Sequence, residues 1–333
     1  MALLEINNLH TSFVTEQGSV QAVRGVNFSL NEKEVLGIVG ESGSGKSQTM
    51  YSLIGLLADN GRVTEGSITY DGQEISRNNF KSKKEYEKMM QKIRGNTMGM
   101  IFQDPMTFLN PVLKIKTQLI EPLLNHTKLS KKEAYDRALE LMKLVGIPSP
   151  EKRINQYPFE FSGGMRQRII IAIALACNPK LIIADEPTTA LDVTIQAQIL
   201  DLIDDLRKNS DSSVIMITHD LGVVAKLCDR VAIMYGGMIV EIGSDKEIFK
   251  SPKHPYTKGL LSCVANPEDP DEKELKPIPG SPPDLLNPPV GCPYVDRCDS
   301  AMKICKIKNP DITTFTPTHQ CSCWLNHKKV VKK

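Results

Sequence analysis

The sequence lacks any hydrophobic run long enough to cross a membrane. Its longest uninterrupted apolar stretch, Ile169 to Cys177, has nine residues, whereas a membrane-spanning helix needs about 20. The segment from Met1 to Phe13 has no basic region followed by a long apolar stretch, so we expect no secretory signal. These two absences predict a cytosolic chain that does not cross a bilayer by itself.

An excess of charge of one sign is also missing. The 41 Lys and Arg residues nearly balance the 39 Asp and Glu residues, which leaves a net charge of +2. This balance argues against a dedicated nucleic-acid binder, so no nucleic-acid partner is expected. The 333 residues are 41% hydrophobic and 24% charged, a composition typical of a chain that folds around a packed core, and their number suggests roughly two structural units.

Proline is scarce in the first three quarters of the chain. Residues 1–250 hold 8 of the 21 prolines, and residues 251–333 hold the other 13. The proline-rich run at 277–283 excludes a helix or a central strand there. We therefore predict an α/β domain over 1–250 and a loop-rich extension over 251–333.

Short apolar runs alternate with helical stretches inside 1–250. Strand-like runs occupy residues 26–30, 35–39, 66–70, 181–184, 214–217, 231–234 and 238–240. Between Lys131 and Val145 the apolar residues recur at helical spacing. This alternation predicts a mainly parallel sheet, with an antiparallel piece near the N-terminus.

A phosphate-binding motif follows the predicted strand at 35–39. Gly40-Glu-Ser-Gly-Ser-Gly-Lys-Ser47 matches G-x-x-x-x-G-K-[ST]. Lys46 is expected to reach the β- and γ-phosphates of ATP, and the Ser47 hydroxyl is expected to hold Mg²⁺. A chance glycine-rich turn is the alternative, and the flanking strand and helix disfavour it. The expected phosphate contacts are Gly40, Ser42, Gly43, Ser44, Gly45, Lys46, Ser47 and Gln48.

A second acidic site ends another buried strand. Leu181-Ile-Ile-Ala-Asp185-Glu186 places two carboxylates directly after four apolar residues. Asp185 fits a Mg²⁺ contact of the Walker-B type, and Glu186, one residue further, could polarise the attacking water. A solvated strand end is the plain alternative, and the phosphate-binding motif makes it less favoured.

The segment Phe161-Ser-Gly-Gly-Met-Arg-Gln-Arg168, shortly before these carboxylates, resembles the signature motif of ATP-binding-cassette ATPases. Other elements of that family follow the expected order. Gln103 resembles the Q-loop glutamine, 190–192 the D-loop, His219 the switch histidine, and Phe13 the aromatic residue that stacks on adenine. The resemblance implies a P-loop NTPase (RecA-like) cassette with an antiparallel β subdomain and a helical subdomain at about 104–165.

The resemblance also implies roles for these residues. Cassettes of this family pair head to tail, so Ser162, Gly163 and Gly164 would contact an ATP bound to the partner ATPase. Glu186 would act as general base and His219 would hold the γ-phosphate. Gln103 would contact the Mg²⁺ ion and Asp192 the nucleotide site.

Three further segments resemble one subgroup of this family. They are 103–111, 251–257 and 279–284, and Met165 replaces the usual glutamine as in that subgroup. The subgroup comprises the D-type ATPase subunits of dipeptide and oligopeptide importers, which act at the cytoplasmic face of the cell membrane. The resemblance implies transmembrane permease subunits, a second and different ATPase subunit, and indirectly an extracytoplasmic peptide-binding protein as partners. Nickel or another small solute remains an alternative cargo.

A non-transport cassette ATPase is the other alternative. Chromosomal types carry a long coiled coil between the two nucleotide motifs, but only 116 positions separate Lys46 from Ser162, without sustained heptads. Ribosomal types usually carry two cassettes, and this chain has one. Both observations disfavour that class.

Five of the eight cysteines lie between Cys292 and Cys323. Disulfides are disfavoured in a cytosolic chain, and zinc ligands usually form closer pairs than these, while an iron–sulfur cluster accepts varied spacing. The family resemblance implies a [4Fe-4S] cluster, with zinc as the alternative. The expected ligands are Cys292, Cys298, Cys305 and Cys321, with Cys323 and His319 as spares. A structural role is expected for this metal group; redox sensing by the extension is a rival interpretation.

Overall fold

The computed structural model describes residues 2–189, 192–209, 211–263 and 277–327. The chain forms two compact units, which are described separately. The first contains Asn31–Glu34 and Phe80–Ile217, and the second contains Ala2–Leu30, Val35–Asn79 and the chain from Thr218 onward. Both units draw on residues 1–250, so the domain boundary at 250 stays a prediction from composition.

The first unit contains three parallel strands. They are β6 (Met98–Ile101), β7 (Leu181–Asp185) and β8 (Ser213–Thr218), with β7 in the middle. In register, Ile182 lies opposite Val214. Every residue of β7 and β8 is buried, as expected for apolar strands of a parallel sheet covered on both faces. The strands predicted at 181–184 and 214–217 are therefore confirmed.

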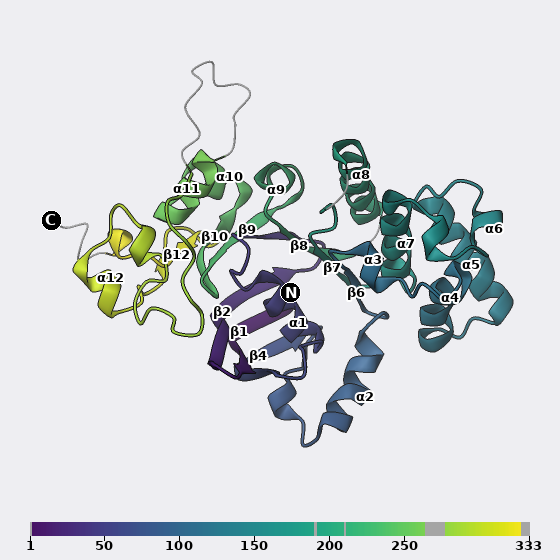
Figure 1. The fold of residues 1–333 in the computed structure, drawn as a ribbon, viewed down its shortest axis with the longest axis horizontal. Helices are drawn as coiled ribbons and strands as arrows, with labels where there is room; N and C mark the ends of the chain where they lie inside the picture. Colours follow the sequence, from purple (N-terminus) through teal and green to yellow (C-terminus); the bar gives the residue numbers. More distant parts are fainter. Residues whose placement is uncertain (1, 190–191, 210, 264–276, 328–333) are drawn as a thin grey trace, which may run out of the picture. The chain divides into compact units, whose positions relative to one another are not determined.

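The helices of the first unit include a group formed by α4, α5, α6 and α7 (Figure 1). The α-helices of this unit are α2 (Lys83–Ile93), α3 (Pro105–Phe108), α4 (Ile115–His126), α5 (Lys131–Leu144), α6 (Pro150–Arg153), α7 (Gly163–Leu175) and α8 (Val193–Asn209). A short 3₁₀ helix, η2, covers Pro158–Glu160. Helix α5 begins with a capping box between Ser130 and Glu133, and its apolar stripe, including Ala138 and Leu141, is fully buried.

The second unit contains an antiparallel sheet in the order β2-β1-β4-β5. Its strands are β1 (Ala2–Thr15), β2 (Gly18–Asn31), β4 (Gly61–Tyr70) and β5 (Gln73–Glu74). Gly72, with φ of 74°, occupies the tight turn between β4 and β5. This sheet is the antiparallel piece that the sequence predicts near the N-terminus.

A second set of strands in this unit joins the extension to the rest of the chain. Strand β3 (Val35–Val39) pairs in parallel with β9 (Arg230–Tyr235), which forms a hairpin with β10 (Met238–Ser244). Two short strands of the extension, β12 (Gln320–Cys321) and β11 (Thr313–Thr314), continue the set beyond β10. Apart from these strands and a few short helices, the described residues of the extension are mostly loop, as its composition predicts.

The helices of the second unit are short. They are α1 (Lys46–Ile54), η1 (Arg77–Asn79), α9 (Leu221–Leu227), α10 (Asp245–Lys250), α11 (Pro255–Ser262), η3 (Val295–Arg297), α12 (Lys303–Ile307) and η4 (Trp324–Asn326). Across the described ranges of the chain, no helix combines the length and apolar character that a membrane span requires.

Candidate functional site

The phosphate-binding motif forms the loop between β3 and α1 in the second unit. Lys46 is only 6% exposed, and its Nζ donates to the carbonyl oxygen of Gly40 at 2.7 Å and to that of Glu41 at 3.0 Å. The lysine is therefore folded back over the loop and held there by two carbonyl groups.

Two glycines of this loop have no room for a side chain. A Cβ atom at Gly40 would collide with the carbonyl oxygen of Met234, and one at Gly45 would collide with that of Ala22. Gly45 caps α1 with φ of 98°, which disfavours other residues. These positions keep the loop close to the strand end, with main-chain N–H groups at the start of α1.

Ser44 carries a buried hydroxyl that fits an anion. Its side-chain oxygen is shielded from solvent and has no hydrogen-bond partner within the described ranges. Buried polar atoms are normally paired, so this hydroxyl can donate to a phosphate oxygen. Ser42 and Gly43, the most exposed residues of the loop, leave its outer side open.

The side chains expected to hold Mg²⁺ have suitable chemistry. Ser47 is half-buried in the first turn of α1, next to Gln48, which is expected to contact the nucleotide. Asp185, the last residue of β7, is 1% exposed. Hydroxyl and carboxylate oxygens are ligands that Mg²⁺ prefers. Ser47 and Asp185 belong to different units, and each fits the predicted role within its own unit.

Glu186 and Gln103 are brought together in the first unit. Gln103 Nε2 donates to Glu186 Oε2 at 2.9 Å, and the Thr189 hydroxyl donates to the same oxygen at 2.9 Å. Glu186 has φ of 45°, a left-handed conformation that costs about 1–3 kcal/mol in a residue other than glycine. The backbone turn and the two donors together orient this carboxylate at the end of β7.

The predicted signature motif lies at the N-terminus of α7. The Ser162 hydroxyl caps the helix by accepting from the Met165 N–H at 3.4 Å, and Ser162 and Gly163 are exposed. A Cβ atom at Gly164 would lie 2.7 Å from Ile195 Cγ2. The motif therefore presents an exposed helix N-terminus that suits an anion.

The predicted D-loop is described only in part. Residues 190 and 191 lie outside the described residues. Asp192 is exposed, and its Oδ1 accepts from the Ile195 N–H at 3.0 Å. The side chain thus supports the first turn of α8.

Phe13 and His219 lie in the second unit. Phe13 is half-buried and pairs across the sheet with Gly61, where a Cβ atom would lie 2.5 Å from its ring. His219 is exposed and follows β8, one residue before Asp220, which caps α9. Their assigned roles in nucleotide binding stay predictions.

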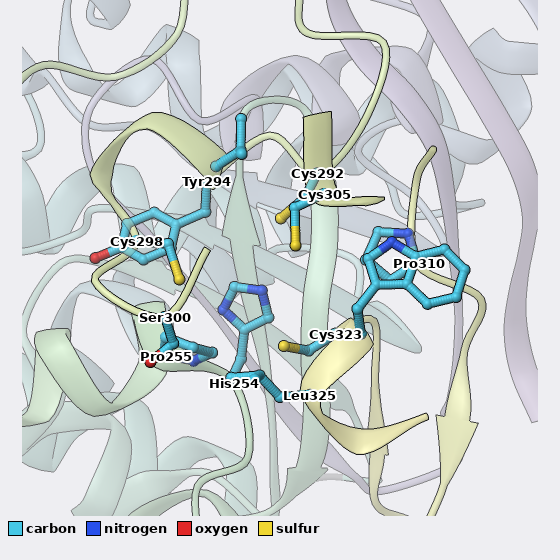
Figure 2. Close-up of a pocket in the computed structure, with 12 residues that line it drawn as sticks. His254, Pro255, Cys292, Tyr294, Cys298, Ser300, Cys305, Pro310, Cys323 and Leu325 are labelled. Atoms are coloured by element: carbon cyan, nitrogen blue, oxygen red, sulfur yellow. The ribbon is translucent and has the colours of Figure 1, made fainter. Parts of the chain in front are cut away.

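Four cysteines of the extension line one pocket. They are Cys292, Cys298, Cys305 and Cys323, and His254 lines the same pocket. Figure 2 shows the four thiols arranged around the His254 ring. Burial, together with the neighbouring thiols of Cys305, Cys323 and Cys298, raises the pKa of Cys292 to about 12.

Cys321, the expected fourth ligand, is not among the residues that line this pocket. It is 1% exposed in β12, and its Sγ accepts from Asn326 Nδ2 at 3.5 Å. Burial raises the pKa of the Cys321 thiol, and the Glu241 carboxylate raises it further. Of the two alternative ligands, His319 contacts Glu241 at 2.7 Å and does not line the pocket. Cys323 is therefore the alternative ligand that lies in the pocket.

The described thiols of this pocket form no site for a single metal ion. Among the described side chains, no group of three or more His, Cys, Asp or Glu converges on a point that could hold a metal ion. A zinc ion needs its ligands within about 2.3 Å, whereas a [4Fe-4S] cluster is larger and its four thiolates bind different iron atoms. The pocket brings together four thiols, the number that such a cluster binds, and the cluster itself stays a prediction.

His254 is a pocket residue that the sequence analysis did not assign to the metal site. It is 1% exposed, and burial lowers its pKa to about 3. Its Nδ1 accepts from the Tyr256 N–H at 3.1 Å, so the neutral ring carries its hydrogen on Nε2. Within the described part of the chain, Nε2 has no hydrogen-bond partner. The signal was present, since His254 lies in the segment 251–257 that the sequence analysis singled out.

Two family models match the chain. The ABC transporter family matches residues 23–189, and the oligopeptide/dipeptide transporter C-terminal region matches residues 240–305. The chain is 54% identical over 331 residues to the oligopeptide transport ATP-binding protein OppD of Bacillus subtilis (strain 168), covering 99% of this chain and 90% of the relative. It is 52% identical over 328 residues to the dipeptide transport ATP-binding protein DppD of the same organism, covering 98% and 96%.

A solved structure supports the same assignment. It is a dimeric ATP-binding cassette in a post-hydrolysis state bound to ADP and phosphate, 28% identical, with a TM-score of 0.63 over 72% of this chain and 98% of the other. This similarity confirms the predicted P-loop NTPase fold. The chain therefore belongs to the ABC transporter ATPase family, in the group that carries the oligopeptide/dipeptide transporter C-terminal region.

Proposed function

We propose that this chain is the ATP-hydrolysing subunit of a membrane importer for dipeptides and oligopeptides. The phosphate-binding loop carries the proposal, because Lys46, the orphan hydroxyl of Ser44 and the start of α1 together suit a nucleotide phosphate. The peptide cargo is inferred from the C-terminal region and from relatives described as peptide transport ATP-binding proteins.

In this proposal the nucleotide residues have distinct tasks. Phe13 would stack on adenine. Ser47, Asp185 and Gln103 would hold Mg²⁺, which would supply positive charge for the phosphates. Glu186 accepts a proton from the attacking water and His219 holds the γ-phosphate. Ser162, Gly163 and Gly164, supported by Asp192, bind the ATP held by a partner ATPase.

The partners follow from this division of labour. We infer transmembrane permease subunits that form the pathway, a second and different ATPase subunit, and a peptide-binding protein outside the membrane. The chain would act as a peripheral subunit at the cytoplasmic face. ATP favours the closed ATPase pair, and hydrolysis releases it.

We further infer that the cysteine pocket holds a [4Fe-4S] cluster with a structural role, with zinc as the alternative. Cys292, Cys298 and Cys305 would bind it, with Cys323 in place of Cys321, because Cys323 lines the pocket. Such a group would stabilise an extension that buries little apolar surface.

The test is transport by the assembled complex. Wild-type complex should hydrolyse ATP and import labelled dipeptides, and Lys46→Ala should lose both activities. If the complex imported Ni²⁺ and no peptide, the proposed cargo would be wrong and the proposed ATPase activity would stand. Hydrolysis by Lys46→Ala at the wild-type rate would contradict the proposed nucleotide site.

A further inference from the structure

Glu41, an unspecified position of the phosphate-binding motif, is held by the extension. Its carboxylate forms a two-pronged ion pair with Arg297, with Nη1–Oε2 at 2.7 Å and Nη2–Oε1 at 3.1 Å. Its N–H donates to the Tyr256 hydroxyl at 3.0 Å, and its carbonyl accepts from Lys46 Nζ at 3.0 Å. Glu41 therefore connects Lys46 to two residues that lie more than 200 positions away.

The Arg297 guanidinium is fixed in this arrangement. Besides Glu41, it donates to the carbonyls of Pro279 at 2.7 Å and Ile278 at 3.2 Å and to the Tyr235 hydroxyl at 3.1 Å. These contacts use all five N–H groups of an arginine. Its side chain is 7% exposed and that of Glu41 is 27% exposed, so the pair is partly shielded from solvent and salt.

Both contacts to Glu41 start from elements that line the cysteine pocket. Arg297 ends the short helix η3, directly before Cys298, and the Val295 N–H donates to the Cys292 carbonyl at 3.2 Å. On the other side, Tyr256 is fully buried and follows His254 by two residues. The phosphate-binding loop is thus supported from the extension at two points.

We propose that Arg297 and Tyr256 are positioning residues for ATP binding. They hold Glu41, and Glu41 holds Lys46 through its carbonyl, so the extension keeps the phosphate-binding loop in its binding conformation. The proposal rests on the nucleotide site proposed above. Losing the ion pair frees the loop at Glu41, and ATP must then bind a loop that is ordered for only part of the time.

The test measures ATP affinity in the assembled complex carrying full-length variants. Arg297→Ala and Glu41→Gln should each raise the Kd and KM for ATP by about 5- to 150-fold, the usual range for coupled sites, while kcat at saturating ATP falls far less. Tyr256→Phe should also weaken binding. Arg297→Lys should recover only part of the affinity, because lysine lacks the planar fork.

Two comparisons make the result decisive. The Arg297→Ala/Glu41→Gln double variant should bind ATP no more weakly than the single variant with the lower ATP affinity. Both substitutions remove the same interaction, so their losses should not add. Lys308→Ala, which breaks the exposed pair with Asp311 in the same extension, should bind ATP as wild type. If Arg297→Ala fails to fold, Glu41→Gln gives the answer from the loop side.

Wild-type ATP affinity in Arg297→Ala or Glu41→Gln, or losses that simply add in the double variant, would overturn the proposal. Lys46→Ala tells whether the positioning role or the proposed nucleotide site itself is wrong. If Lys46→Ala loses ATP binding while Glu41→Gln keeps it, the site stands and the positioning role is wrong.

Discussion

Gln103 donates a 2.9 Å hydrogen bond to the carboxylate of Glu186, 83 residues further along the chain. Thr189 donates to the same oxygen. The carboxylate that is proposed to act on water is therefore already oriented, and one of these two donors is the residue proposed to lie near Mg²⁺. This contact links the predicted Q-loop and the predicted general base through a single oxygen atom.

Replacing Glu186 by Gln should abolish turnover while ATP still binds. The amide keeps the size of the side chain but cannot accept a proton, and general-base catalysis contributes about 10²–10⁴-fold. ATP hydrolysis by the assembled complex and ATP binding at equilibrium are the two measurements. Thr189→Ala, which removes one donor and keeps the carboxylate, should retain most activity. Hydrolysis at the wild-type rate in Glu186→Gln would exclude Glu186 as the base.

The two C-terminal cysteines should differ in their effect on the metal content. Cys323 lines the pocket and Cys321 does not, so Cys323→Ser should lose the iron or zinc while Cys321→Ser keeps it. Anaerobically purified protein, analysed for metal and by absorption spectrum, decides between them. Metal loss in Cys321→Ser alone would restore the ligand set expected from the sequence.

Glu247 should make stability depend on pH. The Glu247 carboxylate is partly buried, which raises its pKa, but hydrogen bonds from Thr316, Ser244 and Thr318 outweigh burial and lower the pKa to about 2 from 4.5. Because the pKa is lower in the folded state, the ionised carboxylate stabilises the fold at pH values above about 4.5. This contribution disappears as the pH falls towards 2. Glu247→Gln should therefore unfold at a lower temperature than wild type at pH 7.

The matched control for this variant is Glu65→Gln, because Glu65 is exposed. Glu65→Gln should change the thermal unfolding midpoint little at pH 7 or at pH 3. The difference in unfolding temperature between Glu247→Gln and wild type should shrink when thermal unfolding is measured near pH 3. A gap that stays constant from pH 7 to pH 3 would contradict the assignment.

Leu141→Ala should destabilise the fold by about 2–5 kcal/mol, the usual cost of such a cavity. Leu141 is fully buried on the apolar stripe of α5, whereas Leu144, in the same helix, is 53% exposed. Leu144→Ala should cost no more than about 0.5 kcal/mol. Denaturant unfolding of the two variants measures both values, and equal losses would contradict the packing of α5.

The elements that the sequence predicts well are those whose pattern is local. The 35–39 and 181–184 runs become β3 and β7 because both faces of each strand are buried. The stripe over 131–145 becomes α5, with Ser130 and Glu133 supplying its start. Strand pairing in the extension was not predicted, because β11 and β12 have only two residues each and depend on distant partners: β12 pairs with β10, and β11 pairs with β12.

The site was predictable where a motif fixes spacing, and not where distant segments meet. The loop from Gly40 to Ser47 is defined by its own glycines. The pair formed by Glu41 and Arg297 spans 256 positions, and neither residue belongs to a fixed position of a motif. Spacing also cannot choose between Cys321 and Cys323, since their difference is that one pairs in β12 while the other lies beyond it.

Strand β12 also shields the edge of a sheet. The Ser322 N–H donates to the Val240 carbonyl at 2.8 Å, and Glu241 and Ile242 pair with Cys321 and Gln320. A chain ended at residue 250 would leave the outer side of β10 bare, and exposed strand edges recruit other chains. We expect such a truncated chain to self-associate, which light scattering would detect. A loss of transport in the truncated chain would then reflect aggregation as well as the missing extension.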